Sequence, residues 1–206
     1  MFFFRKKHKN IRFTWGKLQQ KVIGYKPNII GAFDKEAKLL IINHQSMLDI
    51  VVMEGVLECD TCWCAKKELF EVPVFSYALK FSDMISINRS DKRAIVKLLK
   101  DAKDRLEKNR VLAIFPEGTR GDGKNLLKFQ QGAKILAEKL DIKVQPVVLN
   151  NAKNIFDAKN KKINSGILDI SFLPIIDPKD DENWFLNLHS SMQEELNRLQ
   201  SLHVKN

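Results

Sequence analysis

The sequence contains no apolar run close to the roughly 20 residues that a membrane-spanning helix requires. It also shows no secretory signal, because the apolar run Phe2-Phe3-Phe4 is too short and is followed by basic residues instead of preceded by them. We therefore expect any association of this chain with a membrane to be peripheral.

Cysteine is scarce, with three in 206 residues, at Cys59, Cys62 and Cys64. An odd number in a tight cluster fits a reducing compartment better than a disulfide framework. The spacing could bind a metal ion, but no second pair of ligands lies nearby in the sequence, and Cys62 and Cys64 alternate with Trp63 as the residues of a strand do. We expect no metal site.

Acidic residues are missing from the start of the chain, where Asp34 is the first. Basic residues alternate there with apolar ones, and four apolar residues recur at helical spacing: Ile11, Trp15, Leu18 and Val22. A basic amphipathic helix is typical of a membrane surface, where each cation near an anionic leaflet contributes about 1 kcal/mol. The alternatives are a helix packed on the domain with a solvated basic face, or a nucleic-acid contact, for which no module pattern is present. We interpret residues 1–30 as a membrane-surface segment.

The chain carries a formal net charge of +10, which favours an anionic partner such as a membrane, a phosphorylated substrate, nucleic acid or an acidic protein. Its length suits one domain with a full core, and 44% hydrophobic residues argue against global disorder. We therefore assign residues 31–206 to one main domain.

Short apolar runs alternate with helical patterns along this domain. Predicted strands cover residues 39–42, 61–65, 84–87, 111–115, 144–149 and 166–173. Predicted helices cover residues 50–57, 74–81, 90–109, 129–140 and 183–202. The alternation predicts an α/β domain with a mostly parallel sheet covered by helices, preceded by a short N-terminal amphipathic helical segment.

Two prolines modify this prediction. We expect residues 24–31, which contain Pro27, to form a loop. We expect the strand that contains Pro146 to lie at an edge or to carry a bulge, because proline has no N–H for the ladder.

The polar stretch from Asn43 to Asp49 lies between a predicted strand and a predicted helix, where loops commonly carry chemistry. His44 and Asp49 are five residues apart, and on one continuous helix they would diverge by about 140°. If His44 lies on the loop and Asp49 in the first helical turn, the carboxylate can fix the tautomer of a histidine that accepts a proton. The alternative is that Asp49 only caps the helix and His44 is an ordinary loop residue.

Polar residues also follow two other predicted strands, and the carboxyl ends of parallel strands meet in one crevice. Asn88 and Arg89 follow one strand, and Arg120 belongs to the turn after another. Two arginines at that crevice could bind a phosphate through paired N–H donors. The alternative is that they are ordinary surface charges.

The turn after residue 115 contains Glu117 and Gly118. Glu117 could orient an arginine or accept a hydrogen bond from a substrate hydroxyl. Gly118 permits a tight turn or a close approach of the backbone to a ligand. The alternative is that these residues form a turn and nothing more.

Four segments resemble the motifs of the glycerolphosphate acyltransferase superfamily, in the family's order. They are Asn-His-Gln-Ser-x-x-Asp at 43–49, Ile-Ser-Ile-Asn-Arg at 85–89, Phe-Pro-Glu-Gly-Thr-Arg at 115–120 and Val-Gln-Pro-Val at 144–147. The branch that they resemble is that of the bacterial 1-acyl-sn-glycerol-3-phosphate acyltransferases. The resemblance covers roughly residues 12–149.

The resemblance implies transfer of an acyl group from acyl-CoA or acyl-carrier protein to the 2-hydroxyl of lysophosphatidate, without a cofactor or metal. His44 and Asp49 would be catalytic. The implied substrate-binding residues are Arg89, Glu117, Gly118, Thr119 and Arg120, and the implied supporting residues are Asn43, Ser46, Lys67, Asn88 and Pro146. We expect a peripheral position on the cytoplasmic face of the inner membrane, because many members of the family carry more apolar sequence before the first motif than Phe2 to Phe4. We expect no nucleic-acid partner, because no module pattern is present.

Three other functions remain open from the sequence. The same chemistry could use another glycerolipid or lysophospholipid acceptor. A thioesterase or lipid hydrolase would use water, although Ser46 lacks the Gly-x-Ser-x-Gly setting of a nucleophile. A non-catalytic protein could bind anionic lipid through the basic N-terminal segment.

Overall fold

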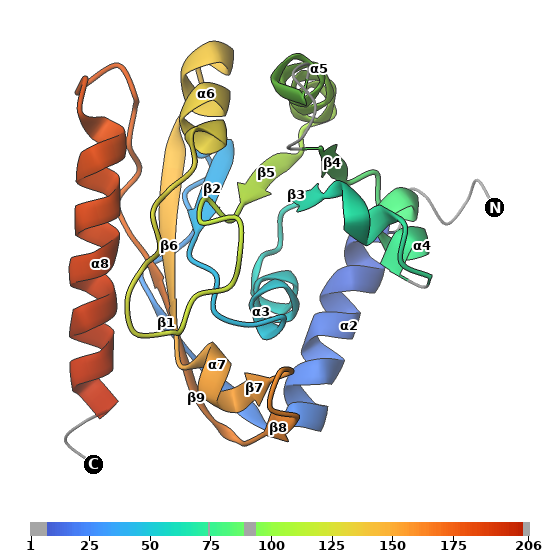
Figure 1. The fold of residues 1–206 in the computed structure, drawn as a ribbon, viewed down its shortest axis with the longest axis vertical. Coiled ribbons are helices and arrows are strands. Elements are labelled where there is room, and N and C mark those ends of the chain that lie inside the picture. Colours follow the sequence, from blue (N-terminus) through green and yellow to red (C-terminus); the bar gives the residue numbers. More distant parts are fainter. Residues whose placement is uncertain (1–7, 74, 89–93, 204–206) are drawn as a thin grey trace.

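The structure is a computed structural model that describes residues 8–73, 75–88 and 94–203 (Figure 1). The described residues form a seven-stranded sheet with the strand order β1-β9-β6-β2-β5-β3-β4. Its strands are β1 (Tyr25–Ile30), β2 (Leu39–Ile42), β3 (Thr61–Lys66), β4 (Ile85–Ile87), β5 (Val111–Ile114), β6 (Val144–Asn150) and β9 (Gly166–Phe172). The five strands from β6 to β4 are parallel, and β9 and β1 run in the opposite direction. The predicted α/β fold with a mostly parallel sheet is confirmed.

Helices cover both faces of the sheet. They are α2 (His8–Ile23), α3 (Leu48–Val56), α4 (Phe75–Phe81), α5 (Ala94–Glu107), α6 (Gln131–Leu140), α7 (Ala152–Ile155), α8 (Trp184–His203) and the 3₁₀ helix η1 (Lys67–Phe70). In Figure 1, α5 and α6 lie on one side of the parallel strands, α2 and α3 lie on the other, and α8 runs beside β6. A short antiparallel hairpin, β7 (Phe156–Asp157) and β8 (Lys162–Ile163), follows α7.

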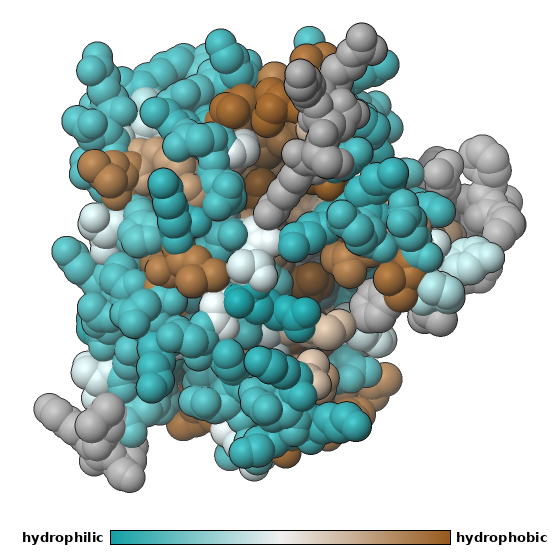
Figure 2. Space-filling view, in the orientation of Figure 1, coloured by the Kyte–Doolittle hydropathy of each residue, from teal (hydrophilic) through white to brown (hydrophobic). Residues whose placement is uncertain are grey.

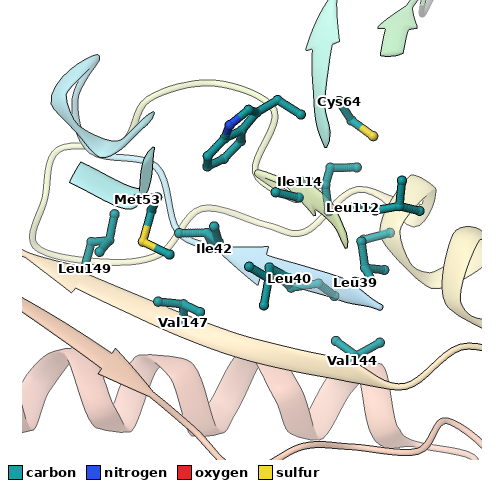
Figure 3. Close-up of a cluster of buried hydrophobic side chains, with 14 of the residues drawn as sticks. Leu39, Leu40, Ile42, Met53, Cys64, Leu112, Ile114, Val144, Val147 and Leu149 are labelled. Atoms are coloured by element: carbon teal, nitrogen blue, oxygen red, sulfur yellow. The ribbon is translucent and has the colours of Figure 1, made fainter. Parts of the chain in front are cut away.

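The central strands are buried on both faces, as in other parallel sheets. All four residues of β2 have no exposed surface. In Figure 3 the side chains of Leu39 and Leu40 lie between those of β5 and those of β6, such as Leu112 and Val147. This rigid core fixes the carboxyl ends of the strands, where the polar loops begin.

Residues 24–31 do not form the loop predicted from Pro27. Tyr25 to Ile30 form β1, the outermost strand, which pairs with β9 in parallel. A proline is tolerated on an edge strand because one side of such a strand has no ladder partner. The prediction treated proline as a breaker of strands, a rule that an edge strand need not follow.

The predicted edge position for the strand that contains Pro146 is also wrong, because β6 lies between β9 and β2. Pro146 O accepts a hydrogen bond from Leu173 N at 3.0 Å, and an N–H at position 146 would donate back to Leu173 O. The amide of Gln145 replaces that donor: its Nε2 donates to Leu173 O at 3.1 Å and to Ala32 O at 2.9 Å. The side chain of Gln145 thus supplies the hydrogen bond that Pro146 cannot donate within the sheet.

The N-terminal helix predicted from Ile11 onwards is present as α2, and it packs on α3 through two glycines. A Cβ atom on Gly16 would lie 2.5 Å from the backbone N of Gly55, so the two helix backbones touch. The apolar stripe of α2 faces away from this contact: Ile11, Trp15, Leu18 and Val22 are 45–70% exposed. The helix therefore packs on the domain by one face and leaves its apolar stripe in solvent.

The described part of the chain contains no helix with the length and apolar character needed to cross a bilayer. Hydrophilic residues cover most of the face drawn in Figure 2, with separate apolar patches between them.

We expect Gly16→Ala to lower the free energy of unfolding by about 1–3 kcal/mol, because the added methyl group forces the α2 and α3 backbones apart. Gly132→Ala is the matched control: Gly132 also lies in a helix, but nothing lies within 4 Å of its added Cβ, so that variant should be neutral or more stable by up to about 1 kcal/mol. Urea unfolding measures both. Equal effects of the two substitutions would contradict the close contact.

Candidate active site

The carboxyl ends of β2, β3, β4 and β5 surround a pocket of about 320 Å³. Its wall is mostly apolar, with side chains such as Ile50, Trp63 and Ile87. Polar side chains reach the same pocket from the loops that follow the strands, among them His44 and Arg120. An apolar pocket with a few convergent polar groups at this edge of a parallel sheet is the usual form of a ligand site.

His44 and Asp49 meet in the arrangement that the sequence predicts. His44 lies in the loop after β2, and Asp49 is the second residue of α3. His44 Nδ1 is 2.8 Å from Asp49 Oδ2. Because a carboxylate oxygen accepts, Nδ1 carries the hydrogen, which leaves Nε2 as the ring nitrogen able to take a proton.

Asp49 is fully buried, and backbone groups compensate its charge. Its Oδ2 also accepts hydrogen bonds from the backbone N–H groups of Gln45 at 2.7 Å and Ser46 at 2.8 Å. The same oxygen therefore fixes the loop and the imidazole. Asp49 is not the N-cap residue of α3. That position is Met47, and the Met47 side chain makes no capping hydrogen bond.

The imidazole of His44 is also held on its face and through its backbone. The ring stacks on Phe115, with centroids 4.0 Å apart and planes 14° apart. The His44 N–H donates to Glu117 Oε1 at 2.7 Å, and its carbonyl accepts from Gly121 N at 2.8 Å. The loop after β2 is thus tied to the loop after β5.

Glu117 is the brace between these loops. It is buried, and its second oxygen, Oε2, accepts from Leu127 N at 2.8 Å. Burial raises the pKa of this carboxyl, while the two backbone hydrogen bonds act in the opposite direction. Gly118 follows with a φ of +69°, and its N–H donates to Phe115 O at 3.0 Å. This left-handed turn explains the glycine.

Basic side chains reach the pocket from two strand ends. Arg120 and its neighbour Thr119 are exposed and line the pocket. Lys66, the last residue of β3, lines it as well, whereas the Nζ of the implied Lys67 is 3.6 Å from Glu71. Sequence reasoning missed Lys66, although its place at the carboxyl end of a parallel strand could have indicated it.

The strand-end pair Asn88-Arg89 is only partly described. Asn88 directly follows β4, whose last residue, Ile87, lines the pocket. Arg89 lies outside the described residues, so its role stays a prediction.

The implied supporting residues of the first motif bind the neighbouring backbone. Asn43 clamps β6: its Nδ2 donates to Leu149 O at 2.9 Å, and its Oδ1 accepts from Leu149 N at 2.7 Å. The Ser46 hydroxyl donates to Phe156 O at 2.5 Å and accepts from Leu48 N at 3.2 Å. Gln45, which sequence reasoning did not select, donates through Nε2 to Leu149 O at 2.9 Å.

The remaining predicted positions lie beside the site. Pro146 pairs with Ile41 of β2 inside the sheet. The three cysteines are unpaired, and burial raises the pKa of the Cys64 thiol, which lines the pocket. Within the described ranges, no three His, Cys, Asp or Glu side chains are grouped as metal ligands would be.

The chain is similar to known proteins, both to a family model and to individual sequences. A family model described as Acyltransferase matches residues 20–150. The 1-acyl-sn-glycerol-3-phosphate acyltransferase of Helicobacter pylori is 46% identical over 168 residues, which cover 81% of this chain and 71% of that protein. The 1-acyl-sn-glycerol-3-phosphate acyltransferase beta of Homo sapiens is 30% identical over 139 residues, 67% of this chain and 50% of that protein. The chain thus spans about half the length of the human relative.

Among solved structures, the crystal structure of the 1-acyl-sn-glycerophosphate (LPA) acyltransferase PlsC from Thermotoga maritima has a similar fold. The TM-score is 0.79 at 21% sequence identity, and the match covers 95% of this chain and 81% of that one. At this identity, the likeness concerns the fold.

We expect Glu117→Gln to lower the free energy of unfolding by about 1–3 kcal/mol. An amide has one acceptor oxygen, so either the His44 N–H or the Leu127 N–H loses its partner at the buried Glu117 side chain. Glu107→Gln, at the exposed end of α5, is the control and should change stability by less than about 0.5 kcal/mol. Urea unfolding of both variants tests this, and a neutral Glu117→Gln would rule out the brace.

Proposed function

The chain belongs to the acyltransferase family, and from this premise we propose that it transfers a fatty acyl group from a thioester to the 2-hydroxyl of 1-acyl-sn-glycerol 3-phosphate, giving phosphatidate. The observation that supports this most is the His44 ring at the pocket wall, with Nδ1 bound to a buried carboxylate. The names of the relatives agree with this substrate.

The proposed reaction needs one base and no acyl-enzyme. Nε2 of His44 takes the proton of the acceptor hydroxyl as its oxygen attacks the thioester carbonyl carbon. The tetrahedral intermediate then collapses, the carbon–sulfur bond breaks, and the imidazolium returns the proton to the thiolate that leaves. Asp49 stabilises the imidazolium between these steps, because its carboxylate is fixed 2.8 Å from Nδ1.

The pocket has both basic and apolar side chains, which match the phosphate and the acyl chain of this substrate. Arg120 and Lys66 supply positive charge for the phosphate, and we assign Arg89 to the same role from its motif. The apolar wall suits an acyl chain. The donor in this proposal is acyl-CoA or acyl-carrier protein, both of which are anionic, as the net charge of +10 favours.

We also propose that α2 lies on an anionic membrane, on the cytoplasmic face of the inner membrane in a bacterium. Its exposed stripe of Ile11, Trp15, Leu18 and Val22 has no covering element among the described residues. Lysines such as Lys17 and Lys21 lie on the same helix. Apolar and basic side chains together match the interface of an anionic bilayer, and three unpaired cysteines fit a reducing compartment.

We expect His44→Ala to reduce phosphatidate formation by at least about a hundredfold, the usual contribution of a general base. Lysophosphatidate is supplied in anionic vesicles, and acyl-CoA and acyl-carrier protein are tried separately. His203→Ala is the matched control. His203 also pairs with a buried aspartate, since its Nε2 is 2.6 Å from Asp169 Oδ2, but it lies at the C-terminal end of α8. That control should keep the wild-type rate.

Equal rates for the wild type and His44→Ala would contradict the role of His44. Activity of the wild type on another lysophospholipid alone would replace the proposed acceptor. Release of free fatty acid regardless of lysophosphatidate would identify a thioesterase instead.

We expect Leu18→Asp to weaken binding to anionic vesicles by at least about tenfold, because burial of one leucine side chain contributes about 1.5–3 kcal/mol. Leu186→Asp is the control: Leu186 is 69% exposed on α8, compared with 54% for Leu18 on α2. Vesicle cosedimentation measures both. Equal losses for the two variants would mean that α2 is not the membrane contact.

A further inference from the structure

Glu54 is a buried carboxylate outside the pocket that the acyl transfer described above does not use. It lies in α3 and is 7% exposed. Burial raises the pKa of this carboxyl, and the Arg12 guanidinium is the main influence in the opposite direction. Acidic side chains are seldom buried unless they are paired, so a carboxylate at this position is expected to have hydrogen-bond or ion-pair partners.

Two donors converge on one oxygen of Glu54. The indole N–H of Trp63 donates to Oε1 at 2.6 Å, and Nη1 of Arg12 approaches the same atom at 2.5 Å. Arg12 also donates to Thr61 O at 2.9 Å and, through Nη2, to Asp60 Oδ1 at 2.7 Å. Glu54 is therefore fixed in place, and it fixes the indole edge of Trp63 in turn.

Trp63 is the first ring of a stack that ends at His44. It is 3% exposed and stacks on Phe115, with centroids 5.2 Å apart and planes 18° apart. Phe115 stacks on the imidazole of His44 at 4.0 Å and 14°. Three nearly parallel rings thus connect the carboxylate of Glu54 to the face of the proposed base.

We propose that Glu54 is a positioning residue for His44 that acts through the stacked rings of Trp63 and Phe115. The proposal rests on the acyl transfer proposed above and adds a second restraint to it. Asp49 holds the edge of the imidazole, and Glu54 determines where its face can lie. Both carboxylates belong to α3, so one short helix sets both restraints.

Arg12 extends this arrangement to α2. Its side chain is 13% exposed and points into the domain, whereas the apolar stripe of the same helix is exposed. The helix proposed to lie on the membrane is thereby joined to the catalytic loop by a chain of direct contacts. Displacement of α2 would remove one of the two donors on Glu54 Oε1.

Substitution of Trp63 by Phe tests the link itself. The variant keeps an aromatic ring for the stack but has no N–H for Glu54, so we expect kcat to fall about tenfold while KM for both substrates stays within about twofold. Trp184→Phe is the matched control: Trp184 is equally buried, donates from Nε1 to Glu138 Oε1 at 3.1 Å and packs on Phe185 in α8. Its kcat should stay within about twofold of the wild type.

Substitution of Glu54 by Leu tests the carboxylate, because a glutamine would keep an oxygen able to accept from both Trp63 and Arg12. Glu138→Leu is the control. We expect Glu54→Leu to lower kcat about as much as Trp63→Phe. The double variant Glu54→Leu/Trp63→Phe should lose no more than either single variant, because the two residues act as one unit. Additive losses would mean that the two residues act independently, and a raised KM with unchanged kcat would mean that Trp63 is only a pocket wall. Either result would overturn the proposal.

The ring protons of His44 give a readout that does not depend on turnover. In NMR spectra without substrate, Glu54→Leu should shift the His44 resonances, since the stacked Phe115 ring moves relative to the imidazole, and Glu138→Leu should not. Unshifted resonances in a folded Glu54→Leu variant would overturn the proposal. If Glu54→Leu does not fold, the kcat of Trp63→Phe decides. A wild type that makes no phosphatidate overturns the proposed function, and the His44 resonances then still decide the positioning role.

Discussion

The geometry of the site depends on one buried oxygen, Oδ2 of Asp49. It accepts from the ring of His44 and from the backbone N–H groups of two neighbouring residues, Gln45 and Ser46. A buried carboxylate is costly unless such donors compensate it, so the loop after β2 has little freedom to adopt another shape. The same atom therefore folds the loop and selects the tautomer of the histidine, which makes the local fold and the proposed chemistry inseparable.

Helix α3 connects the loop held by Asp49 to the stacked rings and to the N-terminal helix. It has nine residues, yet it carries Asp49 at its start, Glu54 near its end and Gly55 at the contact with α2. Buried side chains such as Leu48 and Met53 fix it to the core. The position of α3 on the sheet thus determines where Asp49 binds the imidazole, where the stacked rings lie and where the N-terminal helix α2 packs.

Much of this could be predicted from the sequence because the signals are local. Short apolar runs between helical patterns predicted the parallel sheet, and the spacing of His44 and Asp49 allowed one arrangement in which they could meet. The errors concern proline: β1 tolerates Pro27 at the sheet edge, and Gln145 supplies the donor that Pro146 lacks. A side chain that repairs a ladder cannot be identified before the neighbouring strand is known.

The contacts around Glu54 were beyond prediction for a related reason. Arg12, Glu54 and Trp63 belong to three different elements, and nothing in their spacing indicates that they share an oxygen. Long-range pairing, not propensity, decides such cases.

The role of the Asp49 carboxylate is tested most directly by the kcat of Asp49→Asn. An asparagine can place its one acceptor oxygen where Oδ2 lies and keep all three hydrogen bonds, but it has no negative charge to stabilise the imidazolium that forms when His44 takes the proton. The predicted result is a folded variant whose kcat is lower by about a hundredfold or more, with no further loss in the double variant with His44→Ala. A folded Asp49→Asn variant with the kcat of the wild type would contradict the account.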